Sequence, residues 1–315
     1  MSALSDEDRI LGGLYGSLVG DALGVPVEFV SRSARKADPV TDMRDYGTHG
    51  QPRGTWSDDG ALLLCSVESL ALKGFDTQDM GERFVRWYVK GHWTARGTLF
   101  DIGFATRKAL SLIEEGCPAE SAGGHDVNDN GNGSLMRILP VVLGAMNVDE
   151  DVLCDRIART SSVTHAHVRS KMACVFFGMM VRAFMAGLSP QDALRQAQTC
   201  FAGRYERSAE FVHFAQAMNA DLALESEDRI RSGGYVIDTL TASLWCLLTT
   251  PTFSECVLKA VNLGDDTDTT GCVAGGLAGV FYGVDAIPTD WVAVLPRQQD
   301  LRRLFETFVS KNQTS

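Results

Sequence analysis

Apolar residues recur at helical spacing along nearly the whole chain. In the first such segment, Ile10, Leu14 and Leu18 lie on one helix face, and Gly12 and Gly16 thin another face for close packing. Strict alternation of apolar and polar residues, the pattern of a half-buried strand, rarely exceeds about five residues. The same helical spacing predicts helices over residues 60–73, 79–91, 102–115, 134–146, 151–160, 168–187, 190–200, 208–224, 235–249, 253–262, 269–281 and 298–311.

The segments between these helices are short and carry glycine, proline or aspartate. Ser189-Pro190, for example, is an N-cap followed by a proline at the first helical position. No internal repeat and no low-complexity linker divides the chain. We therefore predict a single all-α domain over residues 1–315, with short flexible ends at about 1–7 and 312–315.

Composition and charge exclude several classes of partner. The 315 residues are 45% hydrophobic and 22% charged, as in an ordinary globular protein. A net charge of -11 argues against nucleic acid and against an anionic membrane surface, both of which attract clustered Lys and Arg. Val168–Leu188 comes nearest to a membrane span, but Arg169, Lys171 and Arg182 interrupt it, so we expect a buried helix. Met1–Arg9 lacks the pattern of a signal peptide.

The eight cysteines are scattered, and none belongs to a C-x-x-C pair. Most lie in apolar runs such as Leu62–Cys65, whereas a zinc site or a disulfide framework needs tighter spacing. We therefore expect buried, reduced thiols, which favour a cytoplasmic location.

The strongest candidate for chemistry is an acidic segment before the apolar helix at 269–281. Asp265, Asp266 and Asp268 fall within four positions and precede Thr269. Neighbouring carboxylates repel one another unless a cation neutralises them, and hard divalent cations take carboxylate and hydroxyl oxygens. An acidic helix N-terminus without a metal explains the run equally well, because Asp and Thr are good helix caps.

A second cluster, Ser57-Asp58-Asp59, stands directly before the apolar helix at 60–73. Alone, this cluster is more typical of a helix cap than of a metal site. Two clusters of hydroxyls and carboxylates can, however, face each other across a helical bundle and bridge two metal ions. A further carboxylate, Glu28, follows a helix that ends at glycine and proline, and a surface position for it stays open.

Two glycine-rich segments, residues 49–56 and 123–134, are predicted to be irregular, with backbone that permits close approach of a ligand. Together with the acidic clusters, these segments resemble the ADP-ribosylglycohydrolase family, and within it the bacterial dinitrogenase reductase-activating branch. The resemblance runs in the same order from about residue 8 to 297. It rests on residues 20–29, 57–59, 130–137, 164–167, 234–239, 264–271 and 282–288.

The resemblance implies an all-α orthogonal bundle with two Mg²⁺ or Mn²⁺ ions in a central cleft. These ions would hold the two hydroxyls of the distal ribose. One half of the metal shell would come from Ser57, Asp58 and Asp59, and the other from Asp266, Asp268 and Thr269. Ser57 replaces the commoner threonine but keeps the hydroxyl. Asp265 is an additional carboxylate that we leave out of the metal shell.

The resemblance also implies a binding surface for ADP-ribose. The glycine-rich loop would wrap the ligand with Asp129, Gly131, Asn132, Gly133 and Ser134, and its backbone N–H groups would face the diphosphate. His165 and Tyr235 match positions that line the ligand in relatives. For these two residues an ordinary packing role stays open.

The bond to be cut would join the ribose to a protein side chain, and two carboxylates are candidates for catalysis. Glu28 would act as base or acid. Asp101 matches an aspartate near the acceptor guanidinium, which favours arginine-linked ADP-ribose through a bidentate pair. The predicted partner is then an ADP-ribosylated protein. Two alternatives are an inactive relative that binds ADP-ribose or a protein, and an immunity factor that also blocks a cognate ADP-ribosyltransferase toxin.

Overall fold

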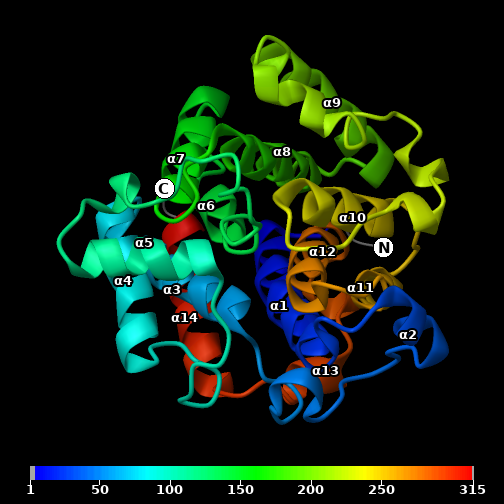
Figure 1. Ribbon diagram of the computed structural model, residues 1–315, viewed down its shortest axis with the longest axis horizontal. Helices are drawn as coiled ribbons and strands as arrows, with labels where there is room; N and C mark the ends of the chain where they lie inside the picture. The colour runs from blue at the N-terminus through cyan, green and yellow to red at the C-terminus, as the bar shows by residue number, and fades with distance from the viewer. Residues whose placement is uncertain (1–3, 314–315) are drawn as a thin grey trace.

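The structure, a computed structural model, describes residues 4–313 and consists of α-helices joined by loops and short 3-10 turns (Figure 1). Within this range β-pairing is limited to three isolated bridges, so the prediction of an all-α fold is confirmed. The helices are α1 (Asp6–Gly24), α2 (Arg32–Ala37), α3 (Asp58–Lys73), α4 (Thr77–Lys90), α5 (Phe104–Glu114), α6 (Leu139–Leu143), α7 (Glu150–Ser162), α8 (Val168–Met185), α9 (Pro190–Tyr205), α10 (Val236–Leu248), α11 (Phe253–Asn262), α12 (Thr267–Tyr282), α13 (Thr289–Ala293) and α14 (Gln298–Gln313).

The ends of the chain are helical closer to the termini than the sequence indicates. Ser5 caps α1 through a reciprocal pair of hydrogen bonds with Asp8, the capping box that fixes a helix start. Helix α14 extends to Gln313. The outer parts of the predicted flexible ends, residues 1–3 and 314–315, lie outside the described residues.

Helices α1 and α12 form the centre of the bundle and run side by side in opposite directions (Figure 1). Their backbones touch, because a Cβ atom at Gly20 would lie 2.0 Å from the carbonyl oxygen of Gly271. Only glycine permits an approach this close. The contact brings the end of α1, with Asp21, next to the start of α12, with Asp268.

The segment Asp6–Val27 is long and apolar enough to cross a membrane by length and composition alone. In the structure 89% of this window is buried inside the protein, as expected for a core helix. The sequence had pointed to Val168–Leu188 as the nearest candidate, and most of that segment forms α8, which is also buried.

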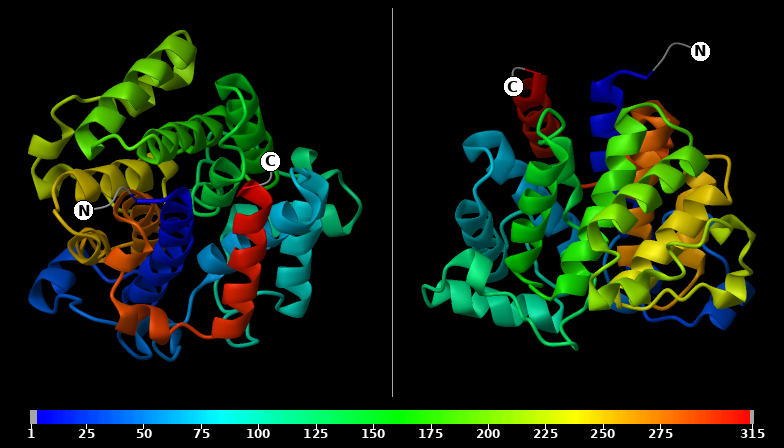
Figure 2. Two further views of the ribbon diagram at one scale, coloured as in Figure 1. Left: turned by 180° about the vertical axis from the view of Figure 1, so that it is seen from behind. Right: turned by 90° about the horizontal axis from the view of Figure 1, so that it is seen from above.

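Helix α3 occupies a second layer beside the central pair and carries an unbroken run of buried residues from Asp58 to Val67. Viewed from behind, α14 lies between α1 and α3 and contacts both (Figure 2). The start of α3 is fixed by Trp56, whose indole N–H donates to the carbonyl of Trp93 at 2.9 Å. The first turn of α3 therefore points into the centre of the molecule, toward the start of α12.

Two predicted helices are wrong in extent. Residues 208–224 form two separate 3-10 turns, η4 (Ala209–Phe214) and η5 (Leu222–Leu224), because side chains bind the backbone between them. The Gln198 amide donates to two carbonyls there, and Asn219 accepts from the N–H of Asp221, which competes with helical bonding. In 134–146 only α6 is helical, since Pro140 lies in its first turn.

Two short helices, α2 and α13, were not predicted from the sequence, because each is too short to repeat an apolar face. Ser31 caps α2 by accepting from the N–H of Ala34, and Pro288 precedes α13. Helix α2 belongs to the long connection between α1 and α3, which forms one rim of the site described next.

Candidate active site

A cleft of about 410 Å³ opens at the point where the starts of α3 and α12 meet. Loops supply the rest of its walls: the segment after α1, the segment before α5, and the glycine-rich loop before α6. The residues predicted from the sequence that line it are Glu28, Asp58, Asp59, Asp101, Asp129, Gly131, Asn132, Gly133, His165, Asp266 and Thr269.

The two predicted halves of the metal shell lie together beside this cleft: Asp58, Asp59, Asp266 and Thr269 line it, and Asp268 is buried next to them. The hydroxyl of Thr269 donates to Asp59 at 3.3 Å, which links segments far apart in the sequence. Oxygens of Asp21, Asp59 and Asp268 lie within 4.8 Å of one another, and a second such group joins Glu28, Asp266 and Asp268. Asp268 belongs to both groups, so the carboxylates form one continuous cluster.

Burial of these carboxylates leaves negative charge without a partner. Burial, and then neighbouring carboxylates, raise the pKa of Asp58, Asp59 and Asp268 well above the usual value. One oxygen of Asp59 and one of Asp266 are buried without any hydrogen-bond partner. Unpaired carboxylate oxygens, with the hydroxyl of Thr269, are the donor set that hard divalent cations prefer. These residues therefore fit a cation site.

Asp21 belongs to this cluster although sequence analysis assigned it no role. Its carboxylate accepts from the backbone N–H of Ser57 at 2.9 Å and of Gly60 at 2.8 Å. It thus holds the first turn of α3 in place, and burial raises its pKa to about 7. The available signal was a lone carboxylate within the apolar helix 10–24.

Ser57 and Asp265 belong to the two acidic segments, but neither lines the cleft. Ser57 is the N-cap of α3, and its hydroxyl accepts from the N–H of Asp59 at 3.2 Å. It is buried but does not line the cleft. Asp265 is exposed, and its carbonyl oxygen accepts from the N–H of Phe29 at 2.6 Å. The structure thus places Asp265 on the surface, consistent with its omission from the metal shell.

The glycine-rich loop is tied to the acidic cluster through Asn132. Its side-chain amide donates to Asp266 at 2.9 Å and to Thr239 at 2.8 Å. Next to it, His165 is buried, pairs with the Thr164 hydroxyl at 2.8 Å, and has its pKa lowered to about 3 by burial. A Cβ atom at Gly133 would lie 2.7 Å from this imidazole, so the loop and the ring pack tightly.

Two predicted ligand-binding residues do not line the cleft. Ser134 is fully buried and its hydroxyl accepts from Ser161 at 2.9 Å, so its side chain packs in the core. Tyr235 pairs with Gly131 through a β-bridge, and its hydroxyl accepts from Arg169 at 3.1 Å. Tyr235 therefore stands behind the glycine-rich loop, half-buried.

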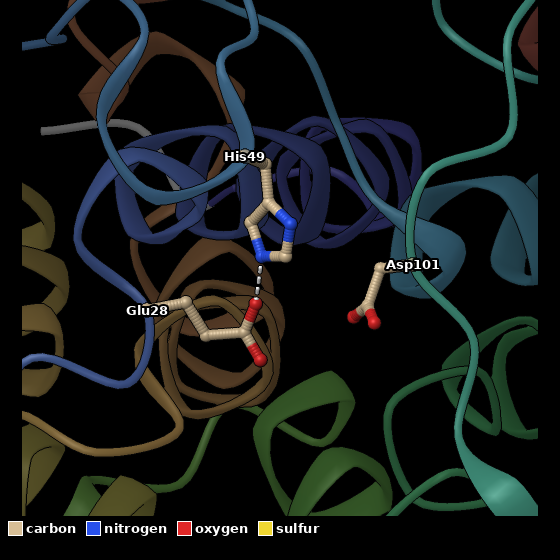
Figure 3. A group of neighbouring side chains, drawn as sticks. All are labelled: Glu28, His49 and Asp101. Carbon is tan, nitrogen blue, oxygen red and sulfur yellow. Dashed lines mark hydrogen bonds and ion pairs between the residues drawn. The ribbon is translucent and has the colours of Figure 1, made fainter.

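The mouth of the cleft carries a group of three titratable side chains, Glu28, His49 and Asp101 (Figure 3). The Nε2 atom of His49 makes a short hydrogen bond to the carboxylate of Glu28. Burial raises the pKa of Glu28 to about 7, and the hydrogen bond to Glu28 raises the pKa of His49. His49 had been recognised only as the start of an irregular glycine-rich segment.

Comparison with known proteins agrees with the fold. The model of the family described as ADP-ribosylglycohydrolase matches residues 2–315. The chain belongs to the ADP-ribosylglycohydrolase family. It is therefore an enzyme of the glycoside hydrolase type, as the sequence motifs predicted.

Two curated ADP-ribosylglycohydrolases illustrate the similarity. An ADP-ribosylarginine hydrolase of Pseudomonas putida (strain GB-1) is 32% identical over 300 residues, which cover 94% of this chain and 76% of that protein. The ADP-ribosyl-[dinitrogen reductase] glycohydrolase of Rhodospirillum rubrum is 31% identical over 316 residues, with 98% of each chain covered. The predicted resemblance to the dinitrogenase reductase-activating branch is thus confirmed.

A solved structure described as an ADP-ribosylglycohydrolase-related protein complex has a TM-score of 0.80 and 32% identity. The match covers 98% of this chain and 99% of the other. The overall helical fold is therefore shared with that solved structure.

Proposed function

We propose that this ADP-ribosylglycohydrolase uses two divalent cations, Mg²⁺ or Mn²⁺, to remove ADP-ribose from arginine side chains of modified proteins. The observation that carries the proposal is the buried carboxylate cluster, in which Asp59 and Asp266 each have an unpartnered oxygen. The names of two relatives, an ADP-ribosylarginine hydrolase and an ADP-ribosyl-[dinitrogen reductase] glycohydrolase, support the substrate class.

Cations in this cluster would be held by Asp58 and Asp59 from α3 and by Asp266, Asp268 and Thr269 from α12, with Ser57 and Asp21 adjacent. When bound, such ions supply Lewis acidity and orient the ribose hydroxyls beside the bond to be cut. The protein contributes the geometry, because Asp21 fixes the start of α3 and Thr269 joins the two segments.

The glycine-rich loop would bind the rest of ADP-ribose. Gly131 and Gly133 line the cleft beside Asp129, and backbone N–H groups in such a loop suit a diphosphate. His165 stays neutral at physiological pH, since its pKa lies near 3, so it forms an uncharged wall against which the loop packs.

Hydrolysis breaks the bond between the anomeric carbon and a guanidine nitrogen, and water supplies the replacing hydroxyl. Glu28, which lines the cleft, would take the proton that the water loses and pass it to the departing guanidine. Asp101 would face the guanidinium at the mouth of the cleft, where a carboxylate can pair with its planar N–H groups.

Two narrower expectations stay predictions. The first is that the protein is cytoplasmic, and the second is that a cognate ADP-ribosyltransferase toxin is among its partners. All eight cysteines are free thiols, which supports a reducing compartment. A stable complex with a toxin, measured by co-purification, would support the second expectation. The sequence also left open an inactive relative that binds ADP-ribose or a protein, and membership of an enzyme family argues against this alternative.

The decisive test is release of ADP-ribose from arginine-, serine- and threonine-linked substrates with Mg²⁺, with Mn²⁺ and with a chelator. We expect metal-dependent turnover of the arginine linkage. Turnover of serine-linked ADP-ribose alone would contradict the linkage, and binding of ADP-ribose without any turnover would favour the alternative.

A further inference from the structure

A tight loop carries His49 to the mouth of the cleft. Tyr46 and Gln51 close this loop through a β-bridge in which the Tyr46 N–H donates to the Gln51 carbonyl at 2.6 Å. Between them lies the 3-10 turn η2 (Gly47–His49), which packs against the turn η1 (Val25–Val27) just before Glu28. The loop thus stands directly against the segment that presents Glu28 to the cleft.

The loop contacts Glu28 at two points. The hydroxyl of Thr48 donates to the Glu28 backbone carbonyl at 2.8 Å, and the His49 imidazole bonds to the Glu28 carboxylate. Gly47, at φ 65°, lies so close to Pro26 that a Cβ atom would be 1.9 Å from the Pro26 carbonyl oxygen. The distance between the loop and Glu28 is therefore fixed by backbone contact.

The imidazole of His49 also packs against two aromatic rings. Its ring centroid lies 5.2 Å from that of Phe100 and 6.1 Å from that of Phe29. Phe29 follows Glu28 and Phe100 precedes Asp101, so the His49 ring connects the segments that carry Glu28 and Asp101. Only 13% of the His49 side chain is exposed, and this burial limits its rotation.

The surroundings of Glu28 are otherwise repulsive. Its carboxylate faces Asp101, Asp266 and Asp268, and like charges favour turning it away from the cleft. Among the residues of the described range, His49 is the one hydrogen-bond partner of this carboxylate. Figure 3 shows that the second carboxylate oxygen points away from His49 and that Asp101 extends toward the pair.

We propose that His49 is a positioning residue, which donates through its Nε2–H to one oxygen of Glu28 and leaves the other oxygen directed into the cleft. The inference rests on the proposed function, because it assigns the contact that holds the catalytic carboxylate in place. A hydrogen bond from a packed ring fixes both the position and the rotation of that carboxylate, as a base for water requires.

The test compares two substitutions of the same ring. His49→Phe keeps the aromatic packing against Phe29 and Phe100 but removes the donor. His49→Gln restores a donor near the position of Nε2. His92→Phe is a matched control, because His92 makes the same kind of bond, 2.8 Å to Glu68, away from the cleft.

With an ADP-ribosylarginine protein and saturating Mg²⁺, we expect His49→Phe to lower kcat by about 10²-fold, within the range that one general acid–base group contributes. KM and the affinity for free ADP-ribose, measured by calorimetry, change by less than about threefold, because substrate binding does not use Glu28. His49→Gln recovers most of kcat, and His92→Phe retains it. A normal kcat in His49→Phe, or a kcat in His49→Gln as low as in His49→Phe, overturns the inference.

Crystal structures of the wild-type and His49→Phe proteins separate this inference from the proposed function. A Glu28 carboxylate that turns away in His49→Phe supports the positioning role, and an unchanged orientation overturns it. An inactive wild-type protein would contradict only the proposed function, because the orientation of Glu28 is read directly from the two structures.

Discussion

Helix α3 carries two carboxylate clusters that differ in how their charge is balanced. At its start, Asp59 lies next to Asp21 and Asp268, and no basic side chain within residues 4–313 forms an ion pair with these three carboxylates. Near its other end, Glu68 pairs with Arg83 and accepts from His92 at 2.8 Å. Arg83 also binds Asp79 at 2.6 Å on α4.

The pKa values of the two clusters move in opposite directions. Burial raises the pKa of Asp59 and Asp268, and no basic side chain in the part of the chain that the structure describes forms an ion pair with them. Burial would also raise the pKa of Glu68, but hydrogen bonds from His92 and Arg83 outweigh it and lower the pKa to about 2. The Glu68 cluster is complete within the chain and stabilises the fold. The Asp59 cluster has no such counter-charge among the described residues, so the cation that we propose would balance it from outside.

The largest effect on turnover is expected when one carboxylate is removed from the cluster at the start of α3, which we call the unbalanced cluster because it has no basic partner among the described residues. Asp58→Ala and Asp266→Ala should each lower turnover by about 10³-fold or more, which corresponds to about 4 kcal/mol of lost transition-state stabilisation. Far-UV circular dichroism should stay that of the wild type. Near-normal rates in both variants would refute the metal assignment.

Breaking the balanced cluster should affect stability and leave the chemistry intact. Arg83 is only 6% exposed, and Arg83→Met leaves Glu68 and Asp79 without their shared cation. We expect a loss of about 3 kcal/mol in the free energy of unfolding, measured by denaturant titration with and without Mg²⁺. Turnover per folded molecule should not change. A tenfold loss of kcat in the folded variant would contradict the separation of the two clusters.

A cation should stabilise the protein only through the unbalanced cluster. At about 100 times its dissociation constant, Mg²⁺ should stabilise the wild type by about 2.7 kcal/mol. Asp268→Asn removes a like charge, so without metal this variant should melt at a higher temperature than the wild type, and it should lose the response to Mg²⁺. Equal responses of the two proteins in thermal denaturation would argue against a cation at Asp268.

The smallest expected effect is a loss of folding stability at acidic pH. The pKa of Glu68 is lowered from its usual value to about 2, so its stabilisation is fully present above about pH 4.5 and is lost as the pH falls toward 2. Because the group is partly exposed, about 1 kcal/mol is expected. Glu68→Gln should flatten the stability curve between these pH values, and an unchanged curve would disprove the assignment.

Local patterns predicted most helices, because an apolar face is written in consecutive turns of the sequence. They also singled out Asp59 and Asp266, since hydroxyls and carboxylates cluster at helix starts. Asp21 and His49 could not be assigned in the same way. Their roles depend on partners that are distant in the sequence or on another turn, Ser57 and Glu28 respectively.

The errors have the same physical origin. Segment 208–224 has helical spacing, but the Gln198 amide, from another helix, takes up its carbonyl groups. Ser134 stands in a motif that suggests contact with a ligand, yet its hydroxyl is buried and accepts a hydrogen bond from Ser161. In both places tertiary contacts decide the outcome, and a single sequence does not record them.

The glycine contact between α1 and α12 bears on which ion the protein selects. Because peptide backbones touch at Gly20 and Gly271, the backbone separation of Asp21 from Asp268 is fixed. A cage of fixed size discriminates by ionic radius and by the number of oxygens that it can present. We therefore expect the proposed Mg²⁺ or Mn²⁺ to bind more tightly than the larger Ca²⁺, which needs a wider shell of oxygens.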